Sequence, residues 1–108
     1  MRPDRPPPDA REVDRVEGVV TVPDEAAADA FLARCVPGAS WSLRIRTAEV
    51  AATVLARVPL GTFDERICTC VRLLLTRPVP VEPGLRFRLI HPADPPIEAV
   101  GVVRPWTS

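Results

Sequence analysis

Hydrophobic and polar residues alternate along much of the chain, a pattern typical of half-buried strands. The clearest runs are 41–46 (WSLRIR) and 85–90 (LRFRLI), in which every second residue is apolar. Further strands are predicted over 48–58, 67–77 and 97–103. The side chains expected to face inward in these runs include Trp41, Leu43, Ile45, Ile67, Thr69, Val71, Leu73, Leu75, Leu85, Phe87 and Leu89.

The first third of the chain predicts one strand followed by one helix. The strand covers 12–22, and its inward face is expected to hold Val16, Gly18, Val20 and Val22. The helix covers 24–34, with Asp24 as the N-cap or first-turn acid and Pro37-Gly38 ending the element. Its predicted apolar stripe is formed by Ala27, Phe31 and Leu32.

Proline and glycine divide the remaining strands. Pro59 is expected to begin a loop that runs through Glu65, and Pro78 and Pro80 exclude a central position in a sheet after residue 77. Gly84 provides a turn that needs a positive φ. Six strands with this punctuation favour a mainly β domain, either a closed barrel or a sandwich, with one short helix inserted after the first strand.

Length and composition place the chain among small intracellular domains. Its 108 residues fit one domain, assigned to 12–108, and the proline- and charge-rich residues 1–11 are expected to be a disordered tail, the alternative being a segment that docks on an aromatic groove. No run approaches the roughly 18 apolar residues of a membrane span, and the N-terminus does not resemble a secretory signal. The net charge of zero argues against a strongly basic nucleic-acid binder.

Three cysteines without a secretory context favour a reducing compartment, so the expected location is the cytoplasm. Cys35, Cys68 and Cys70 are expected to be free thiols. Together with His91 they could ligate zinc, but a single residue between Cys68 and Cys70 is not the spacing of common structural zinc sites. We therefore expect no metal and no cofactor.

The segment 46–105 resembles the third domain of elongation factor Tu. Arg46-Thr47-Ala48-Glu49-Val50 is similar to a family Arg-Thr-x-Asp-Val segment, and the closing hairpin of that domain is matched by Arg77-Pro78-Val79, Gly84-Leu85-Arg86-Phe87 and Gly101-Val102-Val103. The resemblance implies a six-stranded antiparallel closed barrel and a role in translation. The chain contains no lysine, so it cannot form the glycine-rich loop with Lys of P-loop GTPases, and no nucleotide binding by this chain alone is expected.

Two surfaces are candidate partner-binding sites. One is a guanidinium patch, able to bind phosphate or carboxylate, formed by the outward Arg44, Arg46, Arg86 and Arg88; the alternative is a solvated face paired with Glu49, Glu82 or Glu98. The other is an outer apolar stripe of Leu74 beside Cys68, Cys70 and Val100 or Val102; the alternative is that the 24–34 helix covers it through Phe31.

No catalytic set is evident in the sequence. His91 has no local nucleophile, and Ser40 and Ser42 lack a nucleophile-elbow motif. We therefore expect a non-catalytic binding domain that contacts a protein or an RNA-bearing complex. The second hypothesis is an accessory elongation protein that binds aminoacyl-tRNA together with a separate GTPase, and the third is a small enzyme in which His91 lies against Cys68 or an acid. No membrane contact is expected.

Overall fold

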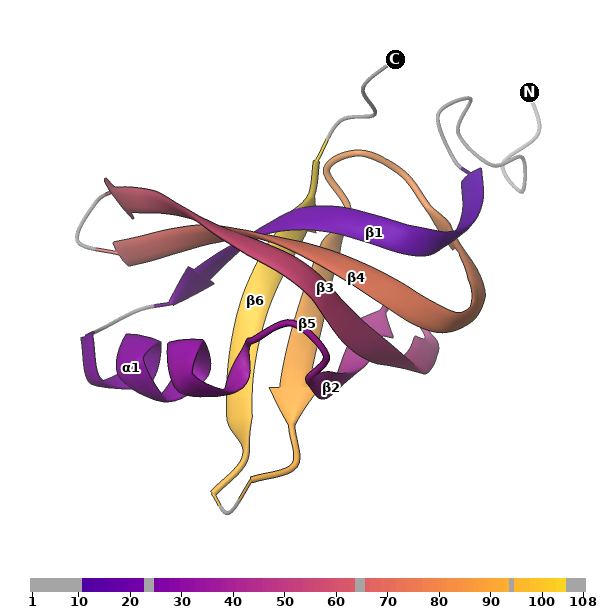
Figure 1. The fold of residues 1–108 in the computed structure, drawn as a ribbon. Coiled ribbons are helices and arrows are strands. Elements are labelled where there is room, and N and C mark those ends of the chain that lie inside the picture. Colours follow the sequence, from indigo (N-terminus) through magenta and orange to yellow (C-terminus); the bar gives the residue numbers. More distant parts are fainter. Residues whose placement is uncertain (1–10, 23–24, 64–65, 94, 105–108) are drawn as a thin grey trace.

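Six antiparallel strands close into a barrel in the order β1–β4–β3–β2–β5–β6 in the computed structural model (Figure 1). The structure describes residues 11–22, 25–63, 66–93 and 95–104. The elements are β1 (Arg11–Val22), α1 (Glu25–Arg34), β2 (Ser40–Ile45), β3 (Ala48–Phe63), β4 (Arg66–Val81), β5 (Arg86–His91) and β6 (Ile97–Val103). The predicted mainly β, six-stranded antiparallel closed barrel with one short helix after the first strand is confirmed.

Strand β1 closes the barrel because it pairs with two neighbours at once. Its central residues lie opposite β4 on one side and opposite β6 on the other; Val19, for example, faces both Cys70 and Val102. The sandwich alternative is therefore wrong. Residues 1–10 of the predicted tail lie outside the described residues, and Arg11 is the first residue of β1.

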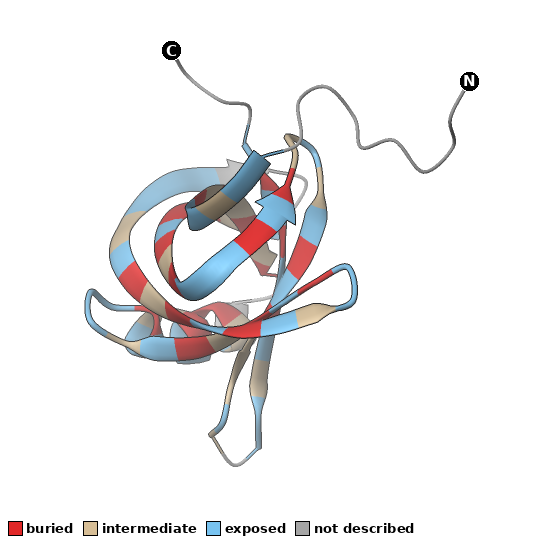
Figure 2. Ribbon diagram, turned by 90° about the vertical axis from the view of Figure 1, so that its right-hand side faces the viewer, coloured by how far each residue is buried: buried red, intermediate tan, exposed pale blue. Residues whose placement is uncertain are grey.

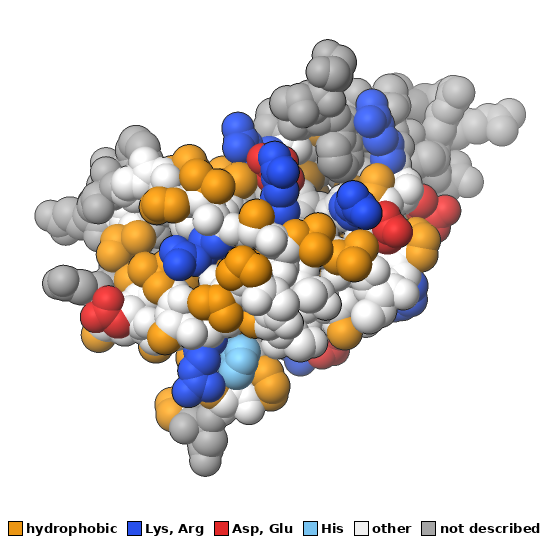
Figure 3. Space-filling view, viewed as in Figure 1, with side chains coloured by type: hydrophobic (Ala, Val, Ile, Leu, Met, Phe, Trp, Pro, Cys, Tyr) orange, Lys and Arg blue, Asp and Glu red, His pale blue; other side chains and the backbone are white. Residues whose placement is uncertain are grey.

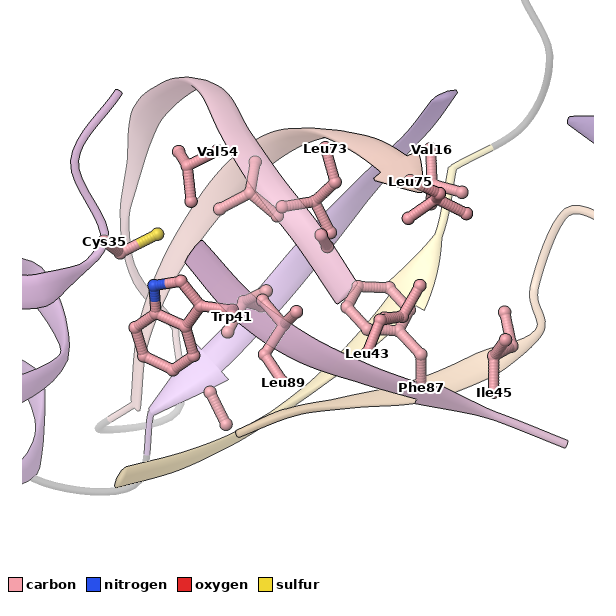
Figure 4. Close-up of a cluster of buried hydrophobic side chains, with 14 of the residues drawn as sticks. Val16, Cys35, Trp41, Leu43, Ile45, Val54, Leu73, Leu75, Phe87 and Leu89 are labelled. Atoms are coloured by element: carbon pink, nitrogen blue, oxygen red, sulfur yellow. The ribbon is translucent and has the colours of Figure 1, made fainter. Parts of the chain in front are cut away.

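The interior of the barrel is filled by alternate side chains of every strand. Buried and exposed residues alternate along the strands (Figure 2), as the period of two predicts. The predicted inner faces are confirmed, although Ile67 and Leu85 are only half-buried. Figure 4 shows the apolar side chains that meet in the core, from Trp41 and Cys35 at one end to Phe87 and Ile45 at the other.

Helix α1 covers the Trp41 end of the core. Phe31 is fully buried and its ring centroid lies 5.4 Å from that of Trp41, whose Nε1 donates a 3.1 Å hydrogen bond to the carbonyl of Arg34. Ala27 and Leu32, predicted to accompany Phe31, pack against the core but are only partly buried, whereas Ala28 and Cys35, the residue after the helix, are fully buried beside Phe31. The predicted cap, Asp24, lies outside the described residues.

The predicted loop after Pro59 is a further correction, since β3 continues to Phe63. Pro59 lies opposite Thr69, and the register shifts between Pro59 and Gly61, where Gly61 has a φ of 115°. A bulge accommodates a residue without an N–H and one with positive φ, so the strand survives both. Asp64 and Glu65, at the end of the predicted loop, lie outside the described residues.

Strand β4 also runs beyond its predicted end at residue 77, to Val81. Its pairing with β3 stops at Leu75, and past that point it pairs with β1 alone, with Pro80 opposite Glu12. The prolines thus occupy an edge, as predicted, while the strand itself is longer. Gly84 has the predicted positive φ, 86°.

Arg46 lies in a turn and not at the end of a strand. Ile45 and Ala48 are paired, so Arg46 and Thr47 form a two-residue hairpin turn in which Arg46 has a φ of 54°. The predicted strand 41–46 is therefore observed as Ser40–Ile45. Among the described residues, no helix is long and apolar enough to cross a membrane.

Candidate functional site

The four predicted arginines line one shallow depression of about 560 Å³ on the outer surface of the barrel. Arg44 on β2 lies directly opposite Arg88 on β5, and Arg88 lies opposite Val100 on β6. Arg86 follows on β5 and faces Val102, while Arg46 reaches the depression from the β2–β3 turn. The strand register therefore brings together arginines from two distant segments of the sequence.

Acidic partners neutralise only half of this cluster. Glu49 lies 3.5 Å from Nε of Arg44, and Glu82 binds Nη2 of Arg46. Within the described part of the chain, Arg86 and Arg88 form no ion pair, and Glu98 pairs with none of the four. Like charges directly opposite each other on neighbouring strands are unfavourable, so the Arg44–Arg88 pair favours an anion between its guanidinium groups.

The predicted stripe around Leu74 is not found as such. Leu74 is half-buried and lies opposite Arg15 on β1 and Thr53 on β3. Strand β1 separates it from Val100 and Val102 on β6. The alternative, in which α1 covers this stripe through Phe31, is also wrong, because Phe31 packs on Trp41 within the core.

A different apolar row, which we call the valine ladder, runs along the outer side of four strands, although Cys70 within it is itself buried. Strand pairing places its members side by side on four strands: Val58 faces Cys70, Cys70 faces Val19, and Val19 faces Val102. Val58 and Val102 are 55% and 41% exposed, and neighbouring Val100 is 49% exposed. Sequence alone gives the outward direction of each side chain, but the order of the strands decides which ones are neighbours.

Glu17 organises a polar cluster at one end of the valine ladder. Its carboxylate accepts a hydrogen bond from Nη1 of Arg104 at 3.1 Å and lies 3.5 Å from Nε of Arg72. The Cys70 thiol lies 3.5 Å from both Glu17 and Arg104. Hydrogen bonding to Cys70, together with attraction to the Glu17 carboxylate, raises the pKa of Arg104 above its usual value. The cluster borders a depression of about 290 Å³.

The three cysteines do not converge. Cys35, the residue that follows α1, is fully buried, and burial raises its pKa to about 11, against a smaller lowering by Arg57. Cys68 is half-buried on the outside of β4, with its sulfur 3.9 Å from Oγ1 of Thr21. Among the described residues, no group of three or more His, Cys, Asp or Glu side chains could hold a metal ion.

His91 does not face a nucleophile or an acid. Its ring packs edge-on against Trp41 at 5.0 Å between centroids, and its buried Nδ1 has no hydrogen-bond partner among the described residues. Ser42 donates a hydrogen bond to Glu49 at 3.1 Å. The arrangement required by the enzyme hypothesis, His91 against Cys68 or a carboxylate, is absent from the described part of the chain.

The sequence matches no protein-family model, and no curated protein matches it. The similarity of residues 46–105 to the third domain of elongation factor Tu therefore stays a prediction. On the face shown in Figure 3, hydrophobic side chains and arginines are interspersed. The arginine depression and the valine ladder are the features that support a functional proposal.

Proposed function

We propose that the protein is a non-catalytic binding domain that recognises an anionic group of a macromolecular partner through Arg44, Arg46, Arg86 and Arg88. The observation that supports this function is the convergence of these four side chains on one depression, although they come from β2, β5 and a turn. Guanidinium groups bind carboxylate and phosphate through paired hydrogen bonds, which gives them geometric specificity as well as charge.

A ligand could readily replace the acidic side chain that now pairs with Arg44 in the depression. The side chains of Arg44 and Glu49 are 55% and 57% exposed, so their ion pair contributes little to stability and is easily replaced. Arg86 and Arg88 bring two positive charges that no described acid balances. An anion placed among the four would relieve the repulsion between Arg44 and Arg88.

The packed interior supports binding at the wall of the barrel rather than catalysis inside it. The core side chains are almost all hydrocarbon, and Thr69 is the one buried polar residue within the described ranges. A reaction needs convergent polar groups in a concave site, which this interior does not offer. We propose that the domain acts in the cytoplasm.

A second candidate function is that of an accessory elongation protein that binds aminoacyl-tRNA together with a separate GTPase. The observation in its favour is the closed six-stranded barrel, which is the fold that the resemblance to elongation factor Tu implies. The arginine depression would then contact tRNA phosphates, since phosphate contacts need no base-specific groups.

Titration with two labelled polyanions tests both functions. We expect the protein to bind tRNA or poly-glutamate at low salt, with weaker binding at high salt. The variant R86A/R88A should lose most of this binding, whereas R15A, which removes an exposed β1 arginine outside the depression, should retain it. Binding of tRNA by the wild-type protein would support the elongation role. Binding of poly-glutamate but not of tRNA would support a protein partner. Absence of binding to both polyanions would contradict the proposal.

A further inference from the structure

The arginine depression is the last of four depressions that lie in a row on the outer surface. Neighbouring depressions share lining residues: Arg104 joins the first to the second, Val102 the second to the third, and Val100 the third to the fourth. The row begins at Glu17 and Val58 and ends at Arg44 and Arg88, so it follows the valine ladder across the barrel wall. We call this row the composite surface.

The composite surface has an aliphatic centre and a positive border. Val19, Val100 and Val102 line its middle, and each of the four depressions is also lined by at least one arginine. Among the described residues Glu17 is the only acid that lines it, and Glu17 is already engaged by Arg72 and Arg104. A chain with a formal net charge of zero thus concentrates cations around exposed valines.

We infer that the composite surface binds an acidic amphipathic segment of a protein partner, a conclusion that rests on the proposed binding function. Aliphatic side chains of the segment would pack on the valine ladder, and its carboxylates would bind the bordering arginines, above all Arg86 and Arg88. Charge complementarity selects an acidic partner, and the exposed valines select one that also carries an apolar stripe.

The closed barrel determines how such a segment docks. At the centre of the composite surface, Val19, Val100 and Val102 lie on strand segments that are paired on both sides, so an incoming chain cannot add a strand there. Contact must therefore be made through side chains. A helix with apolar residues at a spacing of three and four positions would place one stripe on Val19, Val100 and Val102 while its flanking acids reach the arginines.

The aliphatic centre favours a protein over RNA as the occupant. Single-stranded nucleic acids gain affinity by stacking bases on aromatic side chains. Among the described residues, Phe87 is the only aromatic one that lines the row, and it is 2% exposed and belongs to the core. RNA would bring polar phosphates and sugars against the valines and bury little apolar surface of its own. An aliphatic stripe would remove apolar surface of both partners from water, which favours binding.

Fluorescence anisotropy with synthetic peptides tests this inference. The probes are a Leu/Glu peptide with the leucines on one helical face, a scrambled peptide of the same composition, and poly-glutamate. We expect the amphipathic peptide to bind at least about tenfold more tightly than the scrambled one, because only it presents a continuous apolar stripe. The variant V100T/V102T keeps β-branched side chains on the outer face, so it should fold normally and lose roughly tenfold in affinity for the amphipathic peptide.

The control variant V36T/L55T replaces two equally exposed apolar residues outside the composite surface and should bind the peptide as the wild type does. Equal affinity for amphipathic and scrambled peptides, or unchanged affinity of V100T/V102T, would overturn the inference. If the wild type then still binds poly-glutamate and R86A/R88A does not, the proposed anion-binding function would stand without the further inference. If the wild type binds neither poly-glutamate nor tRNA, both the proposed function and the further inference are contradicted.

Discussion

Phe87 packs its ring directly against the backbone of Gly101, the residue opposite it in the β5–β6 pair. A Cβ atom on Gly101 would lie 2.4 Å from Cζ of Phe87, and one on Gly18 of β1 would lie 2.6 Å from the same ring. The ring is buried and therefore cannot move aside into solvent. One side chain thus requires glycine on two neighbouring strands at the point where β1 closes the barrel.

The substitution G101A should therefore destabilise the fold. Overpacking of a dense core costs about 1–3 kcal/mol, so we expect the free energy of unfolding in urea to fall by that amount. The second-site change F87L makes room for the added methyl group. The loss of unfolding free energy in G101A/F87L should therefore be smaller than the sum of the losses in the two single variants. A G101A protein as stable as the wild type would contradict the close packing of Phe87.

The attachment of α1 depends on Trp41. The change W41F removes the hydrogen bond from Nε1 to the carbonyl of Arg34 and part of the contact with Phe31. We expect a loss of about 2 kcal/mol in unfolding free energy. Faster hydrogen exchange should be confined to the amides of α1 and its flanking turn. Uniformly faster exchange through the barrel would show that the indole does not act through the helix.

Thr69 is expected to hold the irregular part of β3. Its buried hydroxyl donates a 3.0 Å hydrogen bond to the carbonyl of Val58, next to the register shift at Pro59 and Gly61. The variant T69V leaves that carbonyl without its partner and should lose about 1–2 kcal/mol on urea unfolding. The control T53V alters a half-buried threonine on the outer side of β3 and should change stability by no more than about 0.5 kcal/mol.

Cys35 should make the protein less stable at alkaline pH. Its pKa is about 11 in the folded protein against an ordinary value of 9.0, because burial disfavours the thiolate. Between these values the unfolded chain releases the proton while the folded protein keeps it, so stability is complete below pH 9 and falls as pH rises towards 11. The loss should reach about 2–3 kcal/mol.

Urea titrations at several pH values measure this slope. The variant C35A should remove most of it, whereas C68A, which alters a half-buried thiol on the outer face, should keep it. Cys35 should also resist alkylation by iodoacetamide until the protein unfolds. Rapid labelling of Cys35 under native conditions would contradict its burial in the core.

Much of the barrel follows from local sequence patterns, because alternation specifies both a strand and its inner face. The runs around Leu43 and Phe87 were predicted with their inward residues correct. The predicted strand ends are wrong where pairing with a neighbouring strand continues past a proline. Pro59 stays within β3 because a bulge absorbs it, and Pro78 stays within β4 because it lies in a register shift of the β1–β4 pair, which resumes at Val79. Arg46 shows the opposite error, because the alternating pattern placed it in a strand and the structure places it in a turn.

The candidate surface was only partly predictable. Arg44 and Arg88 alternate outward in clean strands, so their orientation follows from the sequence, and their meeting follows once β2 lies next to β5. Cys70, Val100 and Val102 were predicted in an outer stripe, but Val19 and Val58 were missed as their neighbours, because this neighbourhood depends on β1 lying between β4 and β6, a long-range order that no local signal specifies. The same order separates Leu74 from Val102. Registers between strands distant in sequence are set by the whole barrel, and they decide which outward residues become neighbours.

Closure of the ring also affects how the molecule comes apart. Releasing an edge strand from an open sheet exposes one new edge, but releasing any strand from this ring exposes an edge on each of its two neighbours. The ring therefore has no edge strand that could be released at the lower cost of a single new edge. We expect the barrel to melt as a single cooperative unit, with calorimetric and van't Hoff enthalpies that agree, and without a stable fragment that retains half the strands.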